Sequence, residues 1–355
     1  MKELKKRTGT GFTLFGLIYI LFQFVDPLFP VEDSNRFFPI FLQLNLVAIG
    51  CYYLIKYFIL YRYNKFGNTV ILFILYIFIY AIFSEYFNNI SLMLMSITAF
   101  FPSFIHARKN SINVSLVYKS LYVLVIYLIF LMLTNRDTIN EAYNSNFEIA
   151  DNYGYLASMI SIVFLFDLKR KSNIIFFVIS TLLTFYSMKK GAILCSLVIS
   201  SFFVYDLVFS RKKYKISIRV MTIILIFVSI FIMNIFISNI VDRFNNIESS
   251  GRDFIYTTIY DAWENSESVS ILFGHGYFAT LNLMDGLYAH SDWFEILYDF
   301  GVFGIIIYTV LFVVYIRNYR KLIKYDSKYK LVFYSLLAIW LIKSMISGVI
   351  VGKDF

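Results

Sequence analysis

Residues 240–304 carry the side chains whose types and spacing could do chemistry, because they form the one long polar interruption in a sequence of apolar runs. They include Arg243, Arg252 and His290. An imidazole can take up a proton near neutral pH, as a general base must. A guanidinium can bind a phosphate or diphosphate through two donors. The stretch therefore predicts a site that combines a base with anion-binding groups.

His290 is the candidate base, since it lies where the polar stretch enters a predicted membrane span. Gly301 and Gly304 follow it and would permit a bend or a close helix contact just beneath the site. Three acids follow the histidine at helical spacing on one face and could orient the imidazole or act as the base themselves: Asp292, Glu295 and Asp299.

Arg252 is predicted to lie in the first turn of an amphipathic helix. Ser250 and Asp253 have the three-residue spacing of a capping box that starts a helix. Arg252 falls on the centre of the apolar face and beside the helix N-terminus, where backbone N–H groups and the helix dipole favour anions. Arg243 is less constrained. The apolar face itself consists of Ile255, Tyr256, Ile259, Ala262 and Trp263.

Lys189 and Lys190 lie on a short turn between two predicted spans, which keeps both ammonium groups at the membrane surface. They can form an anion site at the level of the lipid headgroups. Alternatively, they only extend their charged ends out of the apolar layer.

Composition indicates the elements that must position these groups. Hydrophobic residues make up 59% of the 355 and charged residues 15%, whereas soluble domains have about a quarter charged. We therefore predict an all-α polytopic membrane bundle, 1–355 as a single integral membrane domain, with a long extracytoplasmic loop of short amphipathic helices at 239–293. About eleven apolar runs are long enough to cross a bilayer: 11–29, 37–60, 67–84, 88–107, 114–133, 153–168, 173–188, 191–209, 218–238, 294–316 and 331–351.

The basic residues predict the orientation of the chain. With the N-terminus cytoplasmic, 22 of the 32 lysines and arginines lie in inner loops, as the positive-inside rule requires. The net charge of +9 therefore reflects topology and anionic lipid headgroups and calls for no nucleic acid. Cys51 and Cys195 lie within spans at different predicted depths, so we expect no disulfide and no cysteine metal site.

The segment from Arg252 to Gly304 resembles the signature region of the O-antigen ligase and polymerase family of bacterial membrane proteins. Members show a His followed by Asn, Ser or Gln, nine residues and a Gly-x-x-Gly, and His290-Ser291 followed by Gly301-Val-Phe-Gly304 has that spacing. Gly251-Arg252 before an aromatic-rich helix is similar to the family's large loop. The Gly-x-Gly of Gly274-His275-Gly276 is also similar to the family's large loop. From its position between two glycines, His275 itself is interpreted as a turn residue.

Two departures bear on the kind of family member. Many members have Ser-Arg-Gly where this chain has Met188-Lys189-Lys190-Gly191, and a lysine at 190 keeps the charge but loses the two-donor fork. Tyr256 stands where the ligase pattern often has leucine. Both departures favour a polymerase over a ligase.

The resemblance implies a membrane glycosyltransferase that acts on undecaprenyl-diphosphate-linked oligosaccharides at the outer face of the bacterial cytoplasmic membrane. His290 and Arg252 would be catalytic, and Lys190, Arg243 and Lys189 would bind the diphosphate. Asp292, Glu295, Gly301 and Gly304 would support them. Neither cofactor nor metal is implied, and attack opposite the leaving group would invert the anomeric configuration. Partners would be the lipid bilayer and the flippase and chain-length regulator of the same pathway.

Three alternatives remain open at the level of the sequence. A ligase of the same family would move a finished glycan to a different acceptor. A different membrane glycosyltransferase would use the acidic pair Glu32-Asp33 in the first outer loop. A transporter or lipid-linked oligosaccharide flippase would use intramembrane charges, for which Lys119 and Lys343 are candidates.

Overall fold

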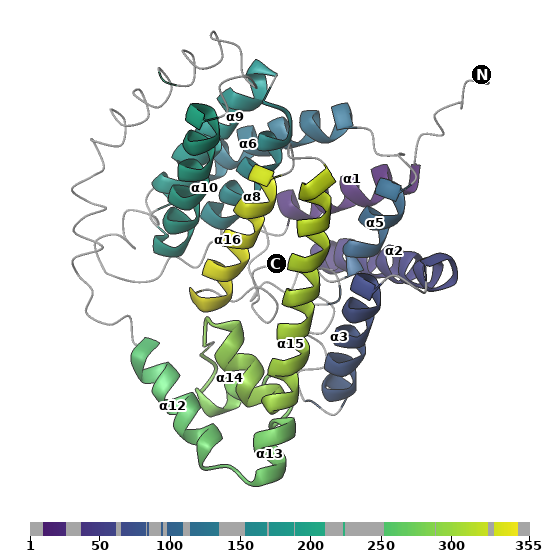
Figure 1. Cartoon of the computed structure of the whole chain (residues 1–355), viewed down its shortest axis with the longest axis vertical. Helices are drawn as coiled ribbons and strands as arrows, with labels where there is room; N and C mark the ends of the chain where they lie inside the picture. The colour runs from purple at the N-terminus through teal and green to yellow at the C-terminus, as the bar shows by residue number, and fades with distance from the viewer. Residues whose placement is uncertain are drawn as a thin grey trace. The chain divides into compact units, whose positions relative to one another are not determined.

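In the computed structural model, the described part of the chain consists mainly of helices (Figure 1). Within the described residues the regular elements are α-helices and one 3-10 helix, with no strand. The described residues are 10–25, 37–61, 65–82, 84, 94, 98–108, 114–134, 153–168, 170–187, 189–209, 223, 252–287, 289–325 and 330–346.

The helices gather into two compact units, of which the first comprises residues 1–120, 254–318 and 348–355. In this unit α1, α2 and α5 pack on one another. Phe15, Phe22, Leu42 and Leu46 form a buried apolar cluster between α1 and α2. The helices of the first unit are α1 (Thr10–Val25), α2 (Phe37–Tyr61), α3 (Lys65–Ile82), α5 (Phe100–Arg108), α12 (Arg252–Glu264) apart from its first two residues, α13 (Ser268–Phe273), α14 (Ala279–Leu283) and α15 (Asp292–Tyr325) as far as Asn318.

The second unit comprises residues 121–253 and 319–347. Here α8 packs on α9, and α10 packs on α8, α9 and α16. Buried hydroxyls at Ser158, Ser161, Thr184 and Ser187 donate to carbonyls three or four residues earlier in the chain, so they need no outside partner. The helices of this unit are most of α6 (Val114–Thr134), α8 (Tyr153–Phe164), η3 (Leu165–Asp167), α9 (Lys171–Tyr186), α10 (Lys190–Phe209) and α16 (Lys330–Ile346).

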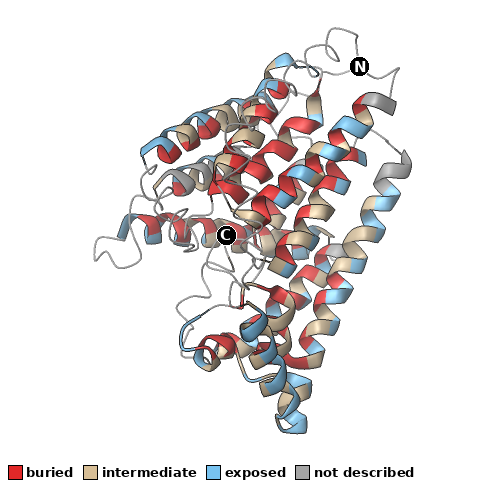
Figure 2. Cartoon of the chain, turned by 90° about the vertical axis from the view of Figure 1, so that its left-hand side faces the viewer, coloured by how far each residue is buried: buried red, intermediate tan, exposed pale blue. Residues whose placement is uncertain are grey.

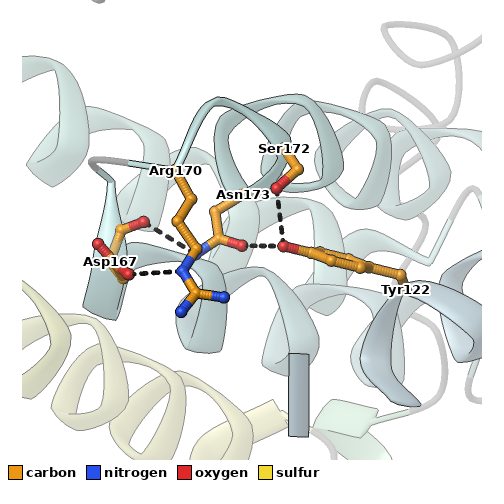
Figure 3. Close-up of polar contacts among 5 residues, drawn as sticks. All are labelled: Tyr122, Asp167, Arg170, Ser172 and Asn173. Atoms are coloured by element: carbon orange, nitrogen blue, oxygen red, sulfur yellow. Dashed lines mark hydrogen bonds and ion pairs between the residues drawn. The ribbon is translucent and has the colours of Figure 1, made fainter. Parts of the chain in front are cut away.

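The turn between α8 and α9 is closed by side chains (Figure 3). Arg170 Nε lies 2.9 Å from Asp167 Oδ2, and Asn173 Nδ2 donates to the Asp167 carbonyl at 2.8 Å. The Tyr122 hydroxyl, from α6, donates to Asn173 Oδ1 and lies 2.9 Å from Ser172 Oγ. These bonds satisfy the polar groups of the turn and join α6 to it.

The helices are those of a membrane protein. Four are long and apolar enough to cross a bilayer by length and composition: Phe37–Tyr61, Val114–Thr134, Lys190–Leu207 and Asp292–Lys321. Buried and exposed residues lie on different faces of the helices (Figure 2), and the exposed faces carry large apolar side chains such as Phe37 (78% exposed) and Ile59 (72%). Such faces suit lipid and not water.

The membrane class is therefore confirmed, while the count of about eleven spans and the single membrane domain stay predictions. The predicted span at 218–238 lies outside the described residues except for Ile223, and 88–107 is described only in part. Both cysteines are free, as expected.

The predicted span at 294–316 differs from the structure, because α15 is broken at Gly301 (φ 66°, ψ −166°). The hydroxyl of Tyr308 donates to Asp292 Oδ2 at 3.0 Å, although the two residues are sixteen positions apart. In a straight helix they would be separated by about 24 Å. The two halves of α15 must therefore fold back beside each other.

Glycines make this reversal possible. The backbone of Gly301 occupies a region that only glycine adopts readily. At Gly304, a Cβ atom would come within 3.1 Å of Ile296 Cγ2, so the halves approach closely where this residue lacks a side chain. Residues 302–325 alone, at about 1.5 Å per residue, are long enough for a bilayer core of about 30 Å. Residues 292–300 are too short to cross it.

Candidate functional site

Three short helices, α12, α13 and α14, form the described part of the long polar stretch. As the sequence predicted, α12 packs through its apolar face, of which Ile259 is buried and the other residues are half-buried. Ile259 is fully buried against Met284 and Ala289. The ring of Tyr256 stacks on that of Phe294 with 4.5 Å between centroids. This packing places α12 against the segment that contains His290.

Arg252 is the first residue of α12, and helical periodicity puts it on the same face as Ile255 and Ile259. Its Nε atom is buried from solvent. Asp253 and Asp261, on other faces of the helix, are exposed. The expected position at the start of the helix and on its apolar face is confirmed, whereas Ser250 and Gly251 lie outside the described residues, as does Arg243.

The break in α15 is completed by donors from elsewhere in the first unit. The last carbonyls before an interruption lose their helical partners, and within a membrane such groups must be satisfied by protein. The Tyr298 carbonyl accepts from the His275 N–H at 3.0 Å and the Asp299 carbonyl from the Gly276 N–H at 2.9 Å. The Tyr76 hydroxyl donates to the Phe300 carbonyl at 2.8 Å. Three successive carbonyls are thus paired.

Two glycine motifs of the sequence meet at this break. A Cβ atom on Gly301 would lie 2.5 Å from the Leu272 carbonyl group and 2.6 Å from the Gly274 nitrogen. Gly274 (φ 83°) and Gly276 (φ 116°) also have backbone conformations that favour glycine. The Gly-x-Gly of the loop therefore packs backbone to backbone against the first glycine of the Gly-x-x-Gly.

Asp299 binds α14 and not His290. Its Oδ2 accepts from the Phe278 N–H at 3.0 Å, and its Oδ1 accepts from the N–H and the hydroxyl of Thr280 at 2.8 and 2.7 Å. The residue is fully buried. It therefore caps the N-terminus of α14 from a distance in sequence and fixes the loop to the first half of α15.

His290 lies immediately before α15 and is partly buried, with a positive φ of 56°. Its neighbours Ala289 and Ser291 are buried. The carboxyl of Glu295, also buried, accepts hydrogen bonds from the backbone N–H groups of Ala289 and His290. The Asp292 carboxylate accepts a hydrogen bond from the Tyr308 hydroxyl. The three acids that share one face in sequence thus have three different partners, and Glu295 is the one bonded to the His290 backbone.

His275 contributes to the packing of the loop. Its ring stacks on Tyr298 with 4.3 Å between centroids, and its Nε2 lies 2.8 Å from Ser266 Oγ. Partial burial lowers the pKa of this histidine. The structure agrees with its interpretation as a turn residue.

Lys189 and Lys190 belong to the second unit, at the start of α10. Both are partly buried, and the ammonium group of Lys189 lies 5.5 Å from the centroid of the Tyr155 ring. Their part in binding a diphosphate stays a prediction. Independence from metal also stays a prediction, although no group of three His, Cys, Asp or Glu in the described ranges could hold a metal ion.

The sequence analysis did not single out three tyrosines that contact groups of this region. Tyr76 bonds to the Phe300 carbonyl, Tyr155 lies beside the Lys189 ammonium group, and Tyr308 bonds to the Asp292 carboxylate. With 29 tyrosines in the chain, residue type carries no signal. Only the pairing of distant segments distinguishes these three.

Comparison with known proteins identifies the region that contains these residues. No curated protein matches the chain. The family model described as O-antigen ligase matches residues 175–309. This range contains the Lys189–Gly191 turn, Arg252, both glycine motifs and His290. Residues 175–309 are thus similar to the O-antigen ligase domain, which is consistent with the O-antigen ligase/polymerase family of membrane proteins.

Proposed function

We propose that this protein is a polysaccharide polymerase that joins undecaprenyl-diphosphate-linked oligosaccharide repeat units at the outer face of the bacterial cytoplasmic membrane. The family match and the asymmetry of basic residues support this assignment. So do the two departures from the ligase pattern at Lys190 and Tyr256. In this proposal the N-terminus is cytoplasmic, and the stretch around 239–293 is extracytoplasmic.

The observation that carries the proposal is the backbone of His290. A non-glycine residue at φ 56° is uncommon. Such strained positions cost about 1–3 kcal/mol and concentrate at active sites. Here the conformation is held from both sides, since Glu295 binds the backbone N–H of His290 and Ala289 is buried against α12. The imidazole is therefore presented from a fixed point at the start of α15.

The proposed chemistry is one displacement. The oxygen of an acceptor sugar hydroxyl attacks the anomeric carbon of the donor, and the bond from that carbon to the diphosphate oxygen breaks. His290 takes the hydroxyl proton, and undecaprenyl diphosphate leaves with the bonding electron pair. Attack opposite the leaving group inverts the anomeric configuration.

Cationic groups stabilise the departing diphosphate in this proposal. The position of Arg252 as the first residue of α12 supports this role, because the positive end of a helix dipole also favours an anion. Lys190, Arg243 and Lys189 also bind the diphosphate in this proposal, on the basis of their charge and their positions in the sequence. Because these side chains supply the neutralising charge, the proposed reaction needs no metal or cofactor.

Substitution of His290 tests the base. His290→Asn is the sharper variant, because asparagine tolerates the left-handed conformation that alanine resists. We expect it to abolish polymer while protein level and thermal stability stay close to wild type. His275→Asn, in the same loop, should leave polymer formation in place. Full-length polymer in His290→Asn would remove His290 from the mechanism.

Substitution of Arg252 tests the two-donor grip. Arg252→Lys keeps the charge but not the fork, so polymer yield should fall nearly as far as in Arg252→Ala. Wild-type activity in Arg252→Lys would show that a simple point charge suffices.

The lipid-linked and acceptor-linked glycans of cells lacking the protein separate the polymerase from the ligase. Single repeat units attached to the final acceptor support a polymerase. Long lipid-linked chains without attachment would show a ligase instead.

A further inference from the structure

The short helix α13 has an apolar face that stays exposed. Val269 is 67% exposed, and Leu272 and Phe273 are exposed as well. Their spacing of three and four residues puts all three side chains on one face of the helix. A single exposed apolar side chain is normal on a protein surface. Three on one face of a helix of six residues need a partner that is itself apolar.

This face continues into the apolar face of α15. The Phe273 ring stacks on the Phe303 ring with 5.0 Å between centroids. A Cβ atom on Gly301 would lie 2.5 Å from the Leu272 carbonyl group, so α13 ends directly against the break in α15. All these residues belong to the first unit. The joint surface, the α13–α15 face, consists of Val269, Leu272, Phe273, Phe303, Ile306 and Val310.

The α15 part of the surface indicates what covers it. Phe303, Ile306 and Val310 are exposed and lie within Asp292–Lys321, which is long and apolar enough to cross a bilayer. Phe303 follows the break by two residues, so α13 lies at the end of this span, beside the start of α15 in Figure 1. At the end of a span the hydrocarbon meets the lipid headgroups.

The polar groups of α13 suit such a boundary. Hydrocarbon satisfies no backbone group, so the protein must pair the last carbonyls of the helix. The Ser270 carbonyl accepts from the Gly274 N–H at 2.7 Å, and the Ile271 carbonyl accepts from the Trp263 indole N–H at 3.3 Å. Tryptophan is itself enriched where membrane meets water. Glu267, at the other end of α13, is exposed and can stay hydrated.

We propose that α13 is an interfacial helix, whose apolar face enters the bilayer next to α15. Such helices bury their apolar face about 5–10 Å into the boundary between headgroups and acyl chains. The partner of the α13–α15 face is therefore lipid. This contact keeps the break in α15 at headgroup depth. The inference goes beyond the proposed function, since it requires only that the second half of α15 crosses the membrane.

Spin labels on single cysteines test the depth of α13 in the full-length protein in phosphatidylcholine nanodiscs. The background is Cys51→Ala with Cys195→Ala, which removes both native cysteines. The label at Val269→Cys is compared with labels at Ile306→Cys, on the span, and at Asp261→Cys, an exposed residue of α12. Collisions are measured with oxygen, which concentrates in hydrocarbon, and with a neutral nickel chelate, which stays in water.

We expect the ratio of oxygen to nickel collisions at Val269→Cys to be shifted well above that at Asp261→Cys, toward that at Ile306→Cys. Leu272→Cys, on the same face, should give the same shift and replaces Val269→Cys if that variant melts early. A ratio at both positions equal to that at Asp261→Cys would place α13 in water and overturn the inference. Labels that neither reagent reaches would overturn it too, because protein would then cover the face. Polymer formation is not part of the readout, so the inference and the proposed polymerase fail separately.

Discussion

Gly301→Ala is the change that most directly tests the folded-back α15. Alanine at φ 66° and ψ −166° is strained by about 1–3 kcal/mol. Its Cβ atom would also lie 2.5 Å from the Leu272 carbonyl group and 2.6 Å from the Gly274 nitrogen, which are backbone atoms that cannot rotate away. Crowding of this kind costs about a further 1–3 kcal/mol. We expect a total destabilisation of about 2–6 kcal/mol.

Two other glycines separate the contributions. At Gly276 (φ 116°) no described atom lies within 4 Å of an added Cβ, so Gly276→Ala introduces strain of about 1–3 kcal/mol without crowding. Gly16, inside α1, has neither a positive φ nor a close neighbour, and alanine there should stabilise by about 0.5–1 kcal/mol.

Thermal unfolding of the three purified variants in detergent provides the measurement, with polymer yield as a second readout. The expected order of melting temperatures is Gly16→Ala highest, then Gly276→Ala, then Gly301→Ala. Polymer should be lost with Gly301→Ala because the segment before His290 depends on the same junction. Equal melting temperatures for Gly301→Ala and Gly276→Ala would refute the close backbone contact. A stable, active Gly301→Ala protein would refute the reversal itself.

Three further outcomes are expected. Asp299→Asn points an amide group at N–H donors of α14 and should destabilise by about 2–4 kcal/mol; the exposed Asp261→Asn is the control, and similar melting of both would contradict the cap. Tyr76→Phe leaves a carbonyl at the break unpaired and should lower the melting temperature, by about 1–3 kcal/mol in free energy, so an unchanged value would show that the bond contributes nothing. Burial lowers the pKa of His275, so the unfolded chain binds the proton more tightly and stability should fall as the pH drops below about 6.5. The slope between pH 7.5 and 5.5 should be shallower in His275→Gln, and identical slopes would exclude this group as the cause.

The helical elements were largely predictable because apolar run length and helical periodicity are local properties. The predicted run at 114–133 is α6 (Val114–Thr134), and the predicted start of a helix at Arg252 is the first residue of α12. The buried face of α12 followed from the three-to-four-residue spacing of Ile255 and Ile259. Such features require no knowledge of distant neighbours.

The break in α15 could be foreseen only in part. Gly301 and Gly304 indicated a bend or a close contact, and the structure has both. Composition could not show that the halves lie side by side, because 292–325 remains apolar and helical on both sides of the glycine. The reversal depends on donors from α3 and from the loop, which pair the carbonyls that Gly301 frees.

The roles of the acids were beyond the reach of the sequence. Asp292, Glu295 and Asp299 share a face at helical spacing, and this suggested a common task for all three. In the structure they bind Tyr308, the backbone beside His290, and the N-terminus of α14. Each partner comes from a different segment, and no local pattern records which segments meet.

The sequence by itself determined that this is a helical membrane protein with a polar segment that carries arginines and a histidine, because hydropathy, charge and motif spacing are written residue by residue. Only the tertiary structure decided that the loop glycines meet the broken helix and that Glu295 bonds to the backbone of His290. The physical reason is that hydrogen bonds and close contacts between segments depend on distances in space, which separation along the chain does not fix.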